Sequence, residues 1–387
     1  MSAPSLNDIY MSRIYTGLVL LTILITACSR NASKENVEEC YNFGKSQIGC
    51  LDSIFSSVEI IPLQFAGDYY PGVVNSLCIG NNHIFIEDND NKLYVFDSNG
   101  TFVSSSHKCY GMGPGEFSRV MGWSWNPYTD RIEILSVDRI LKYDVNFEFV
   151  ESVERIPSSE KDDVIYEQIY DCSATSHYLL PTGVSKDPCR VLKYDTSTDS
   201  IIGVWSYTHD VVALLSMQRQ CFFDMADGTL LFSPPAVTYN VYQIGDETGQ
   251  LTRKITFQPG PDWLSKSVSE GKSMKELMSS KYYIPLKTLV SNSHLLVMAK
   301  NGMKLSDMFY FSIDRKGKTV MKFKLYDEGK YLFPKIDYVE GEYAYAIMER
   351  SHIDESRELL PGNKELIFES LSGVDNETLL LLKYRFK

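Results

Sequence analysis

The residue types that could do chemistry are scattered along this chain rather than grouped into a known motif. No two histidines form the HxH or HxxxH spacing that brings two imidazoles to one metal ion, although six occur: His83, His107, His177, His209, His294 and His352. The sequence also lacks GxSxG, and no pair of carboxylates is spaced so as to single out an acid and a base. No catalytic residue can be named, no metal ligand is assigned and no cofactor is predicted. The balance favours a protein that is not an enzyme.

Five residues are candidates for ligand binding: Arg119, Trp123, Trp125, Asp138 and Arg139. The two tryptophans are two positions apart, so in a strand they face the same side and could form a platform on which a sugar stacks. Packing in the core explains them as well and is favoured, because tryptophan is usually much buried. Asp138 and Arg139 are expected to lie in a turn that could line one mouth of a central channel, although a solvated turn is favoured.

The segment GMGPGEF is rich in residues with special backbone preferences: Gly111, Gly113, Pro114, Gly115, Glu116 and Phe117. Glycine permits backbone angles closed to other residues, and proline stiffens a turn. We interpret the segment as a connection between two structural units, with Phe117 packed into the second. Alternatively its backbone amides cup an anion, although the helix and lysine of a phosphate-binding loop are absent.

Short alternating strands fill the sequence from about residue 58 to its end, and one unit recurs. It consists of an apolar strand ending in an aromatic residue or Ile, an Asp or Gly turn and a second strand: LYVFDSNGTFV, LKYDVNFEFV, LKYDTSTDSII, VYQIGDETGQL and YFSIDRKGKTV, with LLLLKYRF as a final strand. The first four units are about fifty residues apart, a period typical of four-stranded propeller blades. The sequence therefore predicts an all-β fold, a six-bladed β-propeller.

Three details of this propeller can be predicted. Helical insertions are expected in the late blades, at residues 269–279 and within SHIDESRELLPGNKELIFESL. The early strand VEIIPLQ, residues 58–64, is expected to close the ring by pairing with the blade that holds Tyr384, because an open ring would leave unpaired strand edges. In the two DxxG turns, Gly100 and Gly317 are expected to take a positive φ.

The first residues predict where the protein is found. After Arg13, an apolar run leads to the small pair Thr26-Ala27 and then Cys28, which resembles the lipobox of bacterial lipoproteins. We expect residues 1–28 to be a signal peptide ending at a lipid-carrying Cys28, residues 29–53 to be a polar tether, and residues 54–387 to be the propeller. An ordinary signal peptide or an uncleaved anchor is the alternative. The residues after Cys28 lack an early aspartate, which favours the outer membrane and leaves open whether the domain faces the periplasm or the outside.

The charge of the chain excludes one class of partner. With 38 basic and 50 acidic residues the net charge is -12, and no Lys/Arg cluster is present, so nucleic acid is not expected as a partner. Membrane contact is expected only through the lipid.

The cysteines suggest no zinc site, because no CxxC pair is present. The pairs Cys40–Cys50 and Cys172–Cys189 could form disulfides. Buried free thiols are favoured.

Four features carry a resemblance to a known family: the lipobox, the IIPL strand, the FIEDNDNKLYVFDSNG hairpin and, above all, the GMGPGEF segment. In these features the chain resembles the six-bladed propeller lipoproteins of Bacteroidetes, which are similar to NHL-repeat propellers. The resemblance implies the fold and the cell envelope but no reaction. It leaves two hypotheses of function. One is a non-catalytic binding or scaffolding protein for a glycan, a peptide or an envelope protein. The other is a hydrolase or lyase with acidic residues or a divalent metal in the channel, held by several blades.

The lipid anchor is directly testable. We predict that Cys28→Ala abolishes membrane association, because it removes the thiol that would carry the lipid, while the propeller stays folded. Membrane fractionation and circular dichroism of the two proteins measure both outcomes. A variant that still sediments with membranes contradicts the lipoprotein interpretation.

Overall fold

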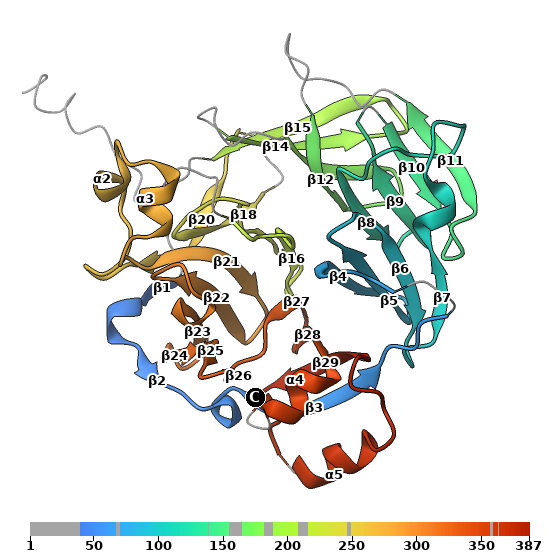
Figure 1. Ribbon diagram of the computed structural model, residues 1–387. Helices are drawn as coiled ribbons and strands as arrows, with labels where there is room; N and C mark the ends of the chain where they lie inside the picture. The colour runs from blue at the N-terminus through green and yellow to red at the C-terminus, as the bar shows by residue number, and fades with distance from the viewer. Residues whose placement is uncertain are drawn as a thin grey trace, which may run out of the picture. The chain divides into compact units, whose positions relative to one another are not determined.

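Strands that follow one another in the sequence pair into antiparallel four-stranded sheets, which stand around a central axis as the blades of a propeller (Figure 1). In this computed structural model the described residues are 39–66, 70–137, 139–154, 165–181, 189–207, 216–245, 249–356, 359–362 and 364–387. All of them lie in one of the two units of the chain, Glu38–Lys387. The expected signal peptide and Cys28 lie outside the described residues.

Within this part of the chain there are six blades, as the sequence predicts. Blade 1 consists of β4 (Val74–Gly80), β5 (His83–Asp88), β6 (Leu93–Asp97) and β7 (Phe102–Ser105). Blade 2 consists of β8 (Gly122–Asn126), β9 (Arg131–Leu135), β10 (Arg139–Tyr143) and β11 (Phe149–Glu154). Blade 3 consists of β12 (Tyr166–Asp171), β13 (Ser176–Pro181), β14 (Cys189–Asp195) and β15 (Ser200–Tyr207). Blade 4 consists of β16 (Phe222–Asp224), β17 (Leu230–Phe232), β18 (Asn240–Ile244) and β20 (Thr252–Gln258). Blade 5 consists of β21 (Ile284–Val290), β22 (His294–Lys300), β23 (Met308–Asp314) and β24 (Val320–Lys324). Blade 6 is β27 (Ile336–Glu340), β28 (Tyr343–Glu349), β29 (Leu379–Phe386) and β3 (Phe55–Pro62).

Blade 6 combines a strand from the N-terminal part of the described chain with three from its C-terminal part. Its outer strand β3 comes from the N-terminal side and pairs antiparallel with β29, with Val58 opposite Tyr384. This confirms the predicted closure, in which β3 pairs with the unit LLLLKYRF as the outer strand of its blade. Phe55 packs its ring 4.8 Å from that of Tyr384, so the closure is also held by aromatic contacts.

The recurring unit is the outer hairpin of a blade, and its aspartate organises the turn. In blade 1 the Asp97 carboxylate accepts hydrogen bonds from the backbone N–H groups of Asn99 and Thr101, both at 2.9 Å. Gly100 takes φ +82°, as predicted, and a Cβ there would lie 2.2 Å from a backbone oxygen. The same prediction is wrong for Gly317, because in blade 5 the positive φ falls one residue later, on Lys318.

The stretch expected as a tether is partly built into the propeller. Strand β1 (Glu39–Asn42) pairs parallel with β20, and β2 (Gln47–Ile48) pairs parallel with β24. A short 3-10 helix, η1 (Phe43–Lys45), lies between them, and η2 (Leu51–Ser53) follows. The Phe43 ring is buried 4.6 Å from that of Trp263, and the burial of such apolar side chains explains why Glu39–Ser53 adheres to the blades. The globular part thus begins before residue 54.

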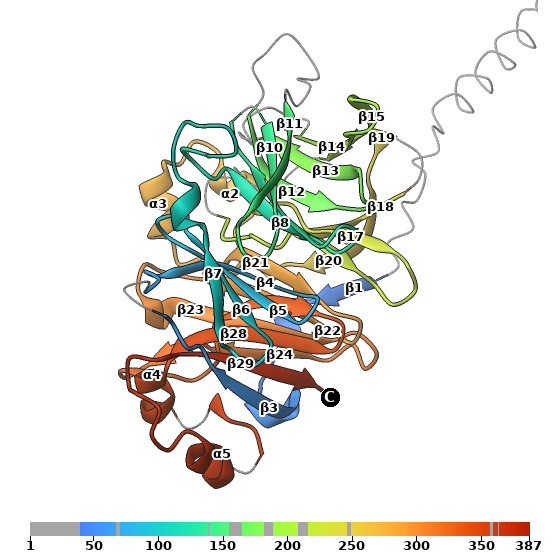
Figure 2. The same ribbon diagram turned by 90° about the vertical axis from the view of Figure 1, so that its right-hand side faces the viewer.

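Helices occur where the late blades have insertions. The predicted helix at 269–279 is two short ones, α2 (Lys266–Ser269) and α3 (Met274–Met278), and the second insertion forms α4 (Arg350–Glu355) and α5 (Lys364–Ser370). Both views place α4 and α5 beside β29 and β3 (Figure 2). Of the described residues, no helix is long and apolar enough to cross a membrane. The remaining short elements are β19 (Gly249–Gln250), β25 (Tyr326–Asp327), β26 (Lys330–Tyr331), η3 (Ser106–Cys109) and η4 (Leu305–Asp307).

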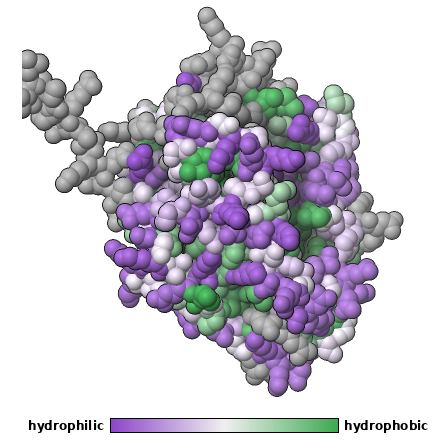
Figure 3. Space-filling model, turned by 60° about the vertical axis from the view of Figure 1, so that its left-hand side comes forward, coloured by the Kyte–Doolittle hydropathy of each residue, from purple (hydrophilic) through white to green (hydrophobic). Residues whose placement is uncertain are grey.

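The core consists of apolar clusters between blades, and the surface is mixed. On the face drawn in Figure 3, hydrophilic residues dominate and hydrophobic ones form small separate patches. Every cysteine in the described part of the chain is free, so neither candidate disulfide is present in this structure. Three of them, Cys109, Cys189 and Cys221, are buried, as the sequence favoured.

A buried cation connects the inner strands of blades 5 and 6. The Lys287 ammonium donates a hydrogen bond to the backbone oxygen of Ile336 at 2.8 Å and lies 3.7 Å from an Asp337 oxygen. Burial disfavours the charged form and lowers the pKa of Lys287 from 10.5 to about 8, although Asp337 opposes this shift.

This lysine predicts a pH dependence of stability. Between pH 8 and 10.5 the unfolded chain holds a proton on residue 287 that the folded chain lacks, so stability rises with pH in that window. Below pH 8 the Lys287 side chain is protonated in both the folded and the unfolded state, so its destabilising effect on the fold no longer changes with pH. Lys287→Met should flatten this rise, which is on the order of 3 kcal/mol, in denaturant unfolding across pH 7–11. The more exposed Lys324→Met is the control, and equal slopes for wild type and Lys287→Met contradict the prediction.

Candidate functional site

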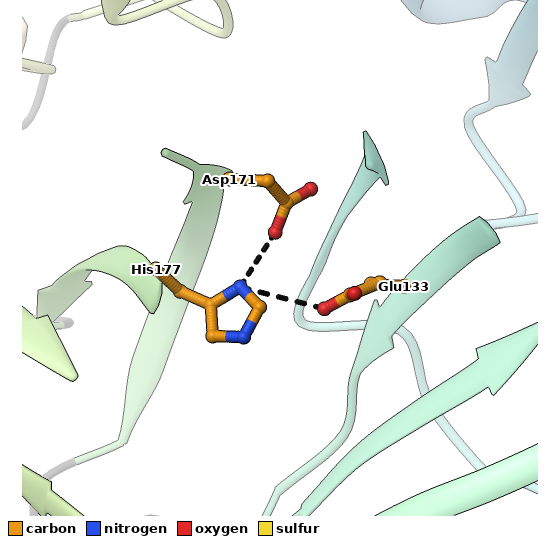
Figure 4. A group of neighbouring side chains, drawn as sticks. All are labelled: Glu133, Asp171 and His177. Atoms are coloured by element: carbon orange, nitrogen blue, oxygen red, sulfur yellow. Dashed lines mark hydrogen bonds and ion pairs between the residues drawn. The ribbon is translucent and has the colours of Figure 1, made fainter. Parts of the chain in front are cut away.

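Three buried polar side chains meet between blades 2 and 3: Glu133, Asp171 and His177 (Figure 4). Glu133 belongs to β9, Asp171 ends β12, and His177 lies opposite Asp171 in β13. The side chains of Glu133 and His177 have no exposed area, and that of Asp171 is 1% exposed. We call these three residues the interblade cluster.

The alternation of strand residues places this cluster. In β9, Ile132 and Ile134 pack in the apolar cluster shared with blade 1, whereas Leu135 packs in the one shared with blade 3. Glu133 has the same parity as Leu135 and so faces blade 3. In β13, His177 shares its face with Leu179, which packs against blade 2. Each of these strands thus carries one polar residue at a position that faces the neighbouring blade, and the polar side chains meet there.

The imidazole Nδ1 of His177 is the point on which both carboxylates converge. It lies 2.6 Å from Oδ1 of Asp171, a hydrogen-bond distance, and 3.4 Å from Oε2 of Glu133. Among the described residues neither Glu133 Oε2 nor His177 Nε2 has a hydrogen-bond partner. Such orphaned buried polar atoms are rare in folded proteins and call for an explanation.

The outer carboxylate oxygens, in contrast, are held by β8. Asn126 Nδ2 donates to Glu133 Oε1 at 2.9 Å, and the Ser124 hydroxyl donates to Asp171 Oδ2 at 2.6 Å. Lys142 lies 3.9 Å from Glu133 Oε1. These contacts orient both carboxylates so that their other oxygens point at His177.

Burial is the main cause of the pKa shift in the cluster. Burial and, after it, the neighbouring carboxylate of Asp171 raise the pKa of Glu133 from 4.5 to about 7, against the opposite effects of His177, Lys142 and Asn126. Two carboxylates beside one imidazole suit a shared proton or a bound cation. Because the cluster is enclosed, it is not placed to touch a substrate.

This cluster was not predicted from the sequence, in which His177 is one of six scattered histidines. The three residues come from three strands, and no local spacing links Glu133 with the other two. The available signal was a charged or imidazole side chain at an inward-facing position of an otherwise apolar strand, as in RIEIL and SHYLLP.

The structure places the predicted tryptophans on one face of β8, toward blade 1. Trp125 is 7% exposed, and its ring is stacked 4.8 Å from that of Phe85. Trp123 is half-buried, and its indole N–H donates to Ser76 and Glu87 at 3.1 and 3.2 Å. The pair therefore packs between blades, and an exposed stacking platform is not what this geometry offers.

The structure brings Arg139 to the GMGPGEF segment, where its guanidinium donates to the Glu116 carbonyl at 3.2 Å. Arg119 is exposed, and Asp138 lies outside the described residues. A groove of about 450 Å³, here called the loop groove, opens at the surface beside this segment. It is lined by Met112, Gly113, Pro114, Gly115, Arg139, Phe149 and Ser152.

The GMGPGEF segment folds around its own glutamate. Glu116 Oε2 accepts a hydrogen bond from the backbone N–H of Gly113 at 2.8 Å, and a Cβ on Gly111 would lie 1.9 Å from that oxygen. This carboxylate occupies the position that an external anion would take. Phe117 is buried and packs near Tyr143 of blade 2, as predicted.

The comparisons with known proteins concern the fold and the family. A family model described as Domain of unknown function (DUF4934) matches residues 36–383. The chain is similar to the crystal structure of a Bacteroides fragilis protein described as exported, with a TM-score of 0.64 and 16% identity over 90% of this chain and 99% of that one. It is also similar to a member of the DUF4221 family from Bacteroides vulgatus, with a TM-score of 0.53 and 12% identity over 86% and 97% of the two chains. No functionally curated protein matches the chain in sequence.

Gly115 provides a test of the loop geometry. It has φ +73°, and a Cβ there would lie 2.5 Å from the Phe149 ring. We predict that Gly115→Ala lowers the free energy of unfolding by about 2–4 kcal/mol. Gly271→Ala is the matched control, because Gly271 has φ +75° but open space around it, and it should cost only about 1 kcal/mol. Equal losses in denaturant unfolding would show that Phe149 does not cover Gly115.

Proposed function

The chain belongs to the DUF4934 family, and on this premise we propose that it is a non-catalytic binding protein of the cell envelope. In this proposal Cys28 carries the lipid that anchors the protein, with the outer membrane as its site, and the propeller presents a binding surface. The proposal includes the kinship with NHL-repeat lipoprotein propellers that the GMGPGEF segment suggests. The similar Bacteroides fragilis propeller, described as exported, supports the compartment.

The observation that carries the proposal is the contrast between a buried polar cluster and an exposed apolar groove. The interblade cluster, which has the residue types of an active site, has almost no exposed area. The loop groove lies at the surface, where Met112 is 86% exposed and Phe149 is 43% exposed. Exposed apolar side chains beside an arginine suit association with another molecule better than they suit catalysis.

The chemistry of the loop groove favours a peptide segment over a glycan. A sugar platform needs exposed aromatic faces, and Trp123 and Trp125 pack between blades instead. The groove offers the Met112 and Phe149 side chains for an apolar residue and the Arg139 guanidinium at its edge for a carboxylate. We therefore propose as partner an envelope protein that presents an apolar residue next to an acidic one.

Site-specific cross-linking in cells tests this proposal. A photoreactive phenylalanine analogue in place of Met112 should yield a discrete adduct with an envelope protein, because Met112 lines the groove and is 86% exposed. The same analogue in place of Met303, which is 68% exposed in blade 5, is the matched control. Phe149→Ser should reduce the Met112 adduct by about tenfold. The same adducts from both positions, or none from position 112, contradict the proposal.

A further inference from the structure

We propose that Glu133, Asp171 and His177 bind one divalent cation of the zinc class, which ties blade 2 to blade 3. The site is separate from the loop groove and does not depend on the proposed partner. Its role is structural, since the three side chains are enclosed between the blades. The donor set of two carboxylate oxygens and one imidazole nitrogen is among those that Zn²⁺ accepts in proteins.

The donor atoms of the three side chains converge on one place. One donor atom from each side chain lies within 4.8 Å of the other two. In a tetrahedral site with bonds of about 2.1 Å, donor atoms are about 3.4 Å apart. The distance from Glu133 Oε2 to His177 Nδ1 is 3.4 Å, whereas Asp171 Oδ1 is 2.6 Å from Nδ1 and would have to move by less than about 1 Å when a cation replaces the shared proton.

A buried oxygen of Glu133 also favours a cation. Glu133 Oε2 is buried, points toward Nδ1 and has no hydrogen-bond donor among the described residues. The proton of one imidazole cannot satisfy both Asp171 Oδ1 and Glu133 Oε2, whereas a cation at their meeting point contacts both. Figure 4 shows both carboxylates directed at the same ring nitrogen.

Surrounding side chains orient both carboxylates. Asn126 holds the outer oxygen of Glu133, and Ser124 holds that of Asp171. Bonds of this kind commonly fix the carboxylates of metal sites, and their loss weakens metal binding.

Little positive charge is placed beside the two carboxylates. Lys142 lies 3.9 Å from Glu133 and is closer to Glu151, at 2.9 Å, farther out in the same blade. A divalent cation between Glu133 and Asp171 would supply positive charge where both carboxylates are buried. Because the site is closed, the cation would enter while the blades pack together.

Metal analysis after refolding tests the inference. The full chain is unfolded in chelator, refolded with Zn²⁺ or with Mn²⁺, freed of excess metal and measured by mass spectrometry. With at least one of the two metals we expect about one ion per wild-type chain. The metal-loaded protein should also have a higher melting temperature than protein refolded without metal. Glu133→Gln and His177→Gln should retain at least about tenfold less metal. Glu148→Gln, a change at a 70% exposed carboxylate of the same blade that pairs with Lys108, should keep it.

Should a variant fail to fold, the wild type alone decides the question. Anomalous diffraction from crystals of the refolded protein should show one peak between Glu133, Asp171 and His177. Less than one ion per ten wild-type chains in both arms overturns the inference and leaves a proton as the occupant. A peak elsewhere, or a folded Glu133→Gln that keeps its ion, overturns it as well.

Discussion

The pairing of β3 with β29 is the constraint on which the rest of this structure depends. The blades pack through apolar faces, and a ring that stayed open would expose the face of blade 6 and a row of unpaired backbone groups. The chain avoids this by supplying the outer strand of its last blade from its N-terminal side, with Val58 opposite Tyr384. Closure therefore depends on a contact between residues more than three hundred positions apart.

A closed ring makes two kinds of position available for function. Between blades, side chains are held so firmly that charged groups can be enclosed, as in the interblade cluster of Glu133, Asp171 and His177. At the surface, the connections between blades can vary without disturbing the sheets, as the GMGPGEF segment shows. There the Glu116 carboxylate and a buried Phe117 fix the backbone, and Met112 and Phe149 are exposed at the surface.

The architecture was predictable because its signals are local and repeated. Alternating strands that end in residues such as Phe96 or Tyr143, followed by an aspartate that closes the turn, recur often enough to give the number of blades. The positive φ at Lys318 was not predictable from DxxG, because hairpin length decides which residue adopts it.

The candidate site could not be predicted, for a physical reason. Its residues meet only because β9, β12 and β13 stand side by side in two neighbouring blades, and one polar residue within an apolar strand gives no sign of its partner. The edge strands β1 and β2 were missed for a related reason. Their polar residues hide the few apolar ones, such as Tyr41 and Phe43, that attach them to blades 4 and 5.

Native-state hydrogen exchange most directly tests the central claim, that β3 closes the ring. If it does, the amides of β29 exchange as slowly as those of β22 in blade 5, and Phe55→Ala, which removes a buried ring from the closure, speeds exchange throughout blade 6. Fast exchange of β29 in the wild type, with blades 2 to 5 still protected, would show that the ring is open at blade 6 and contradict this account.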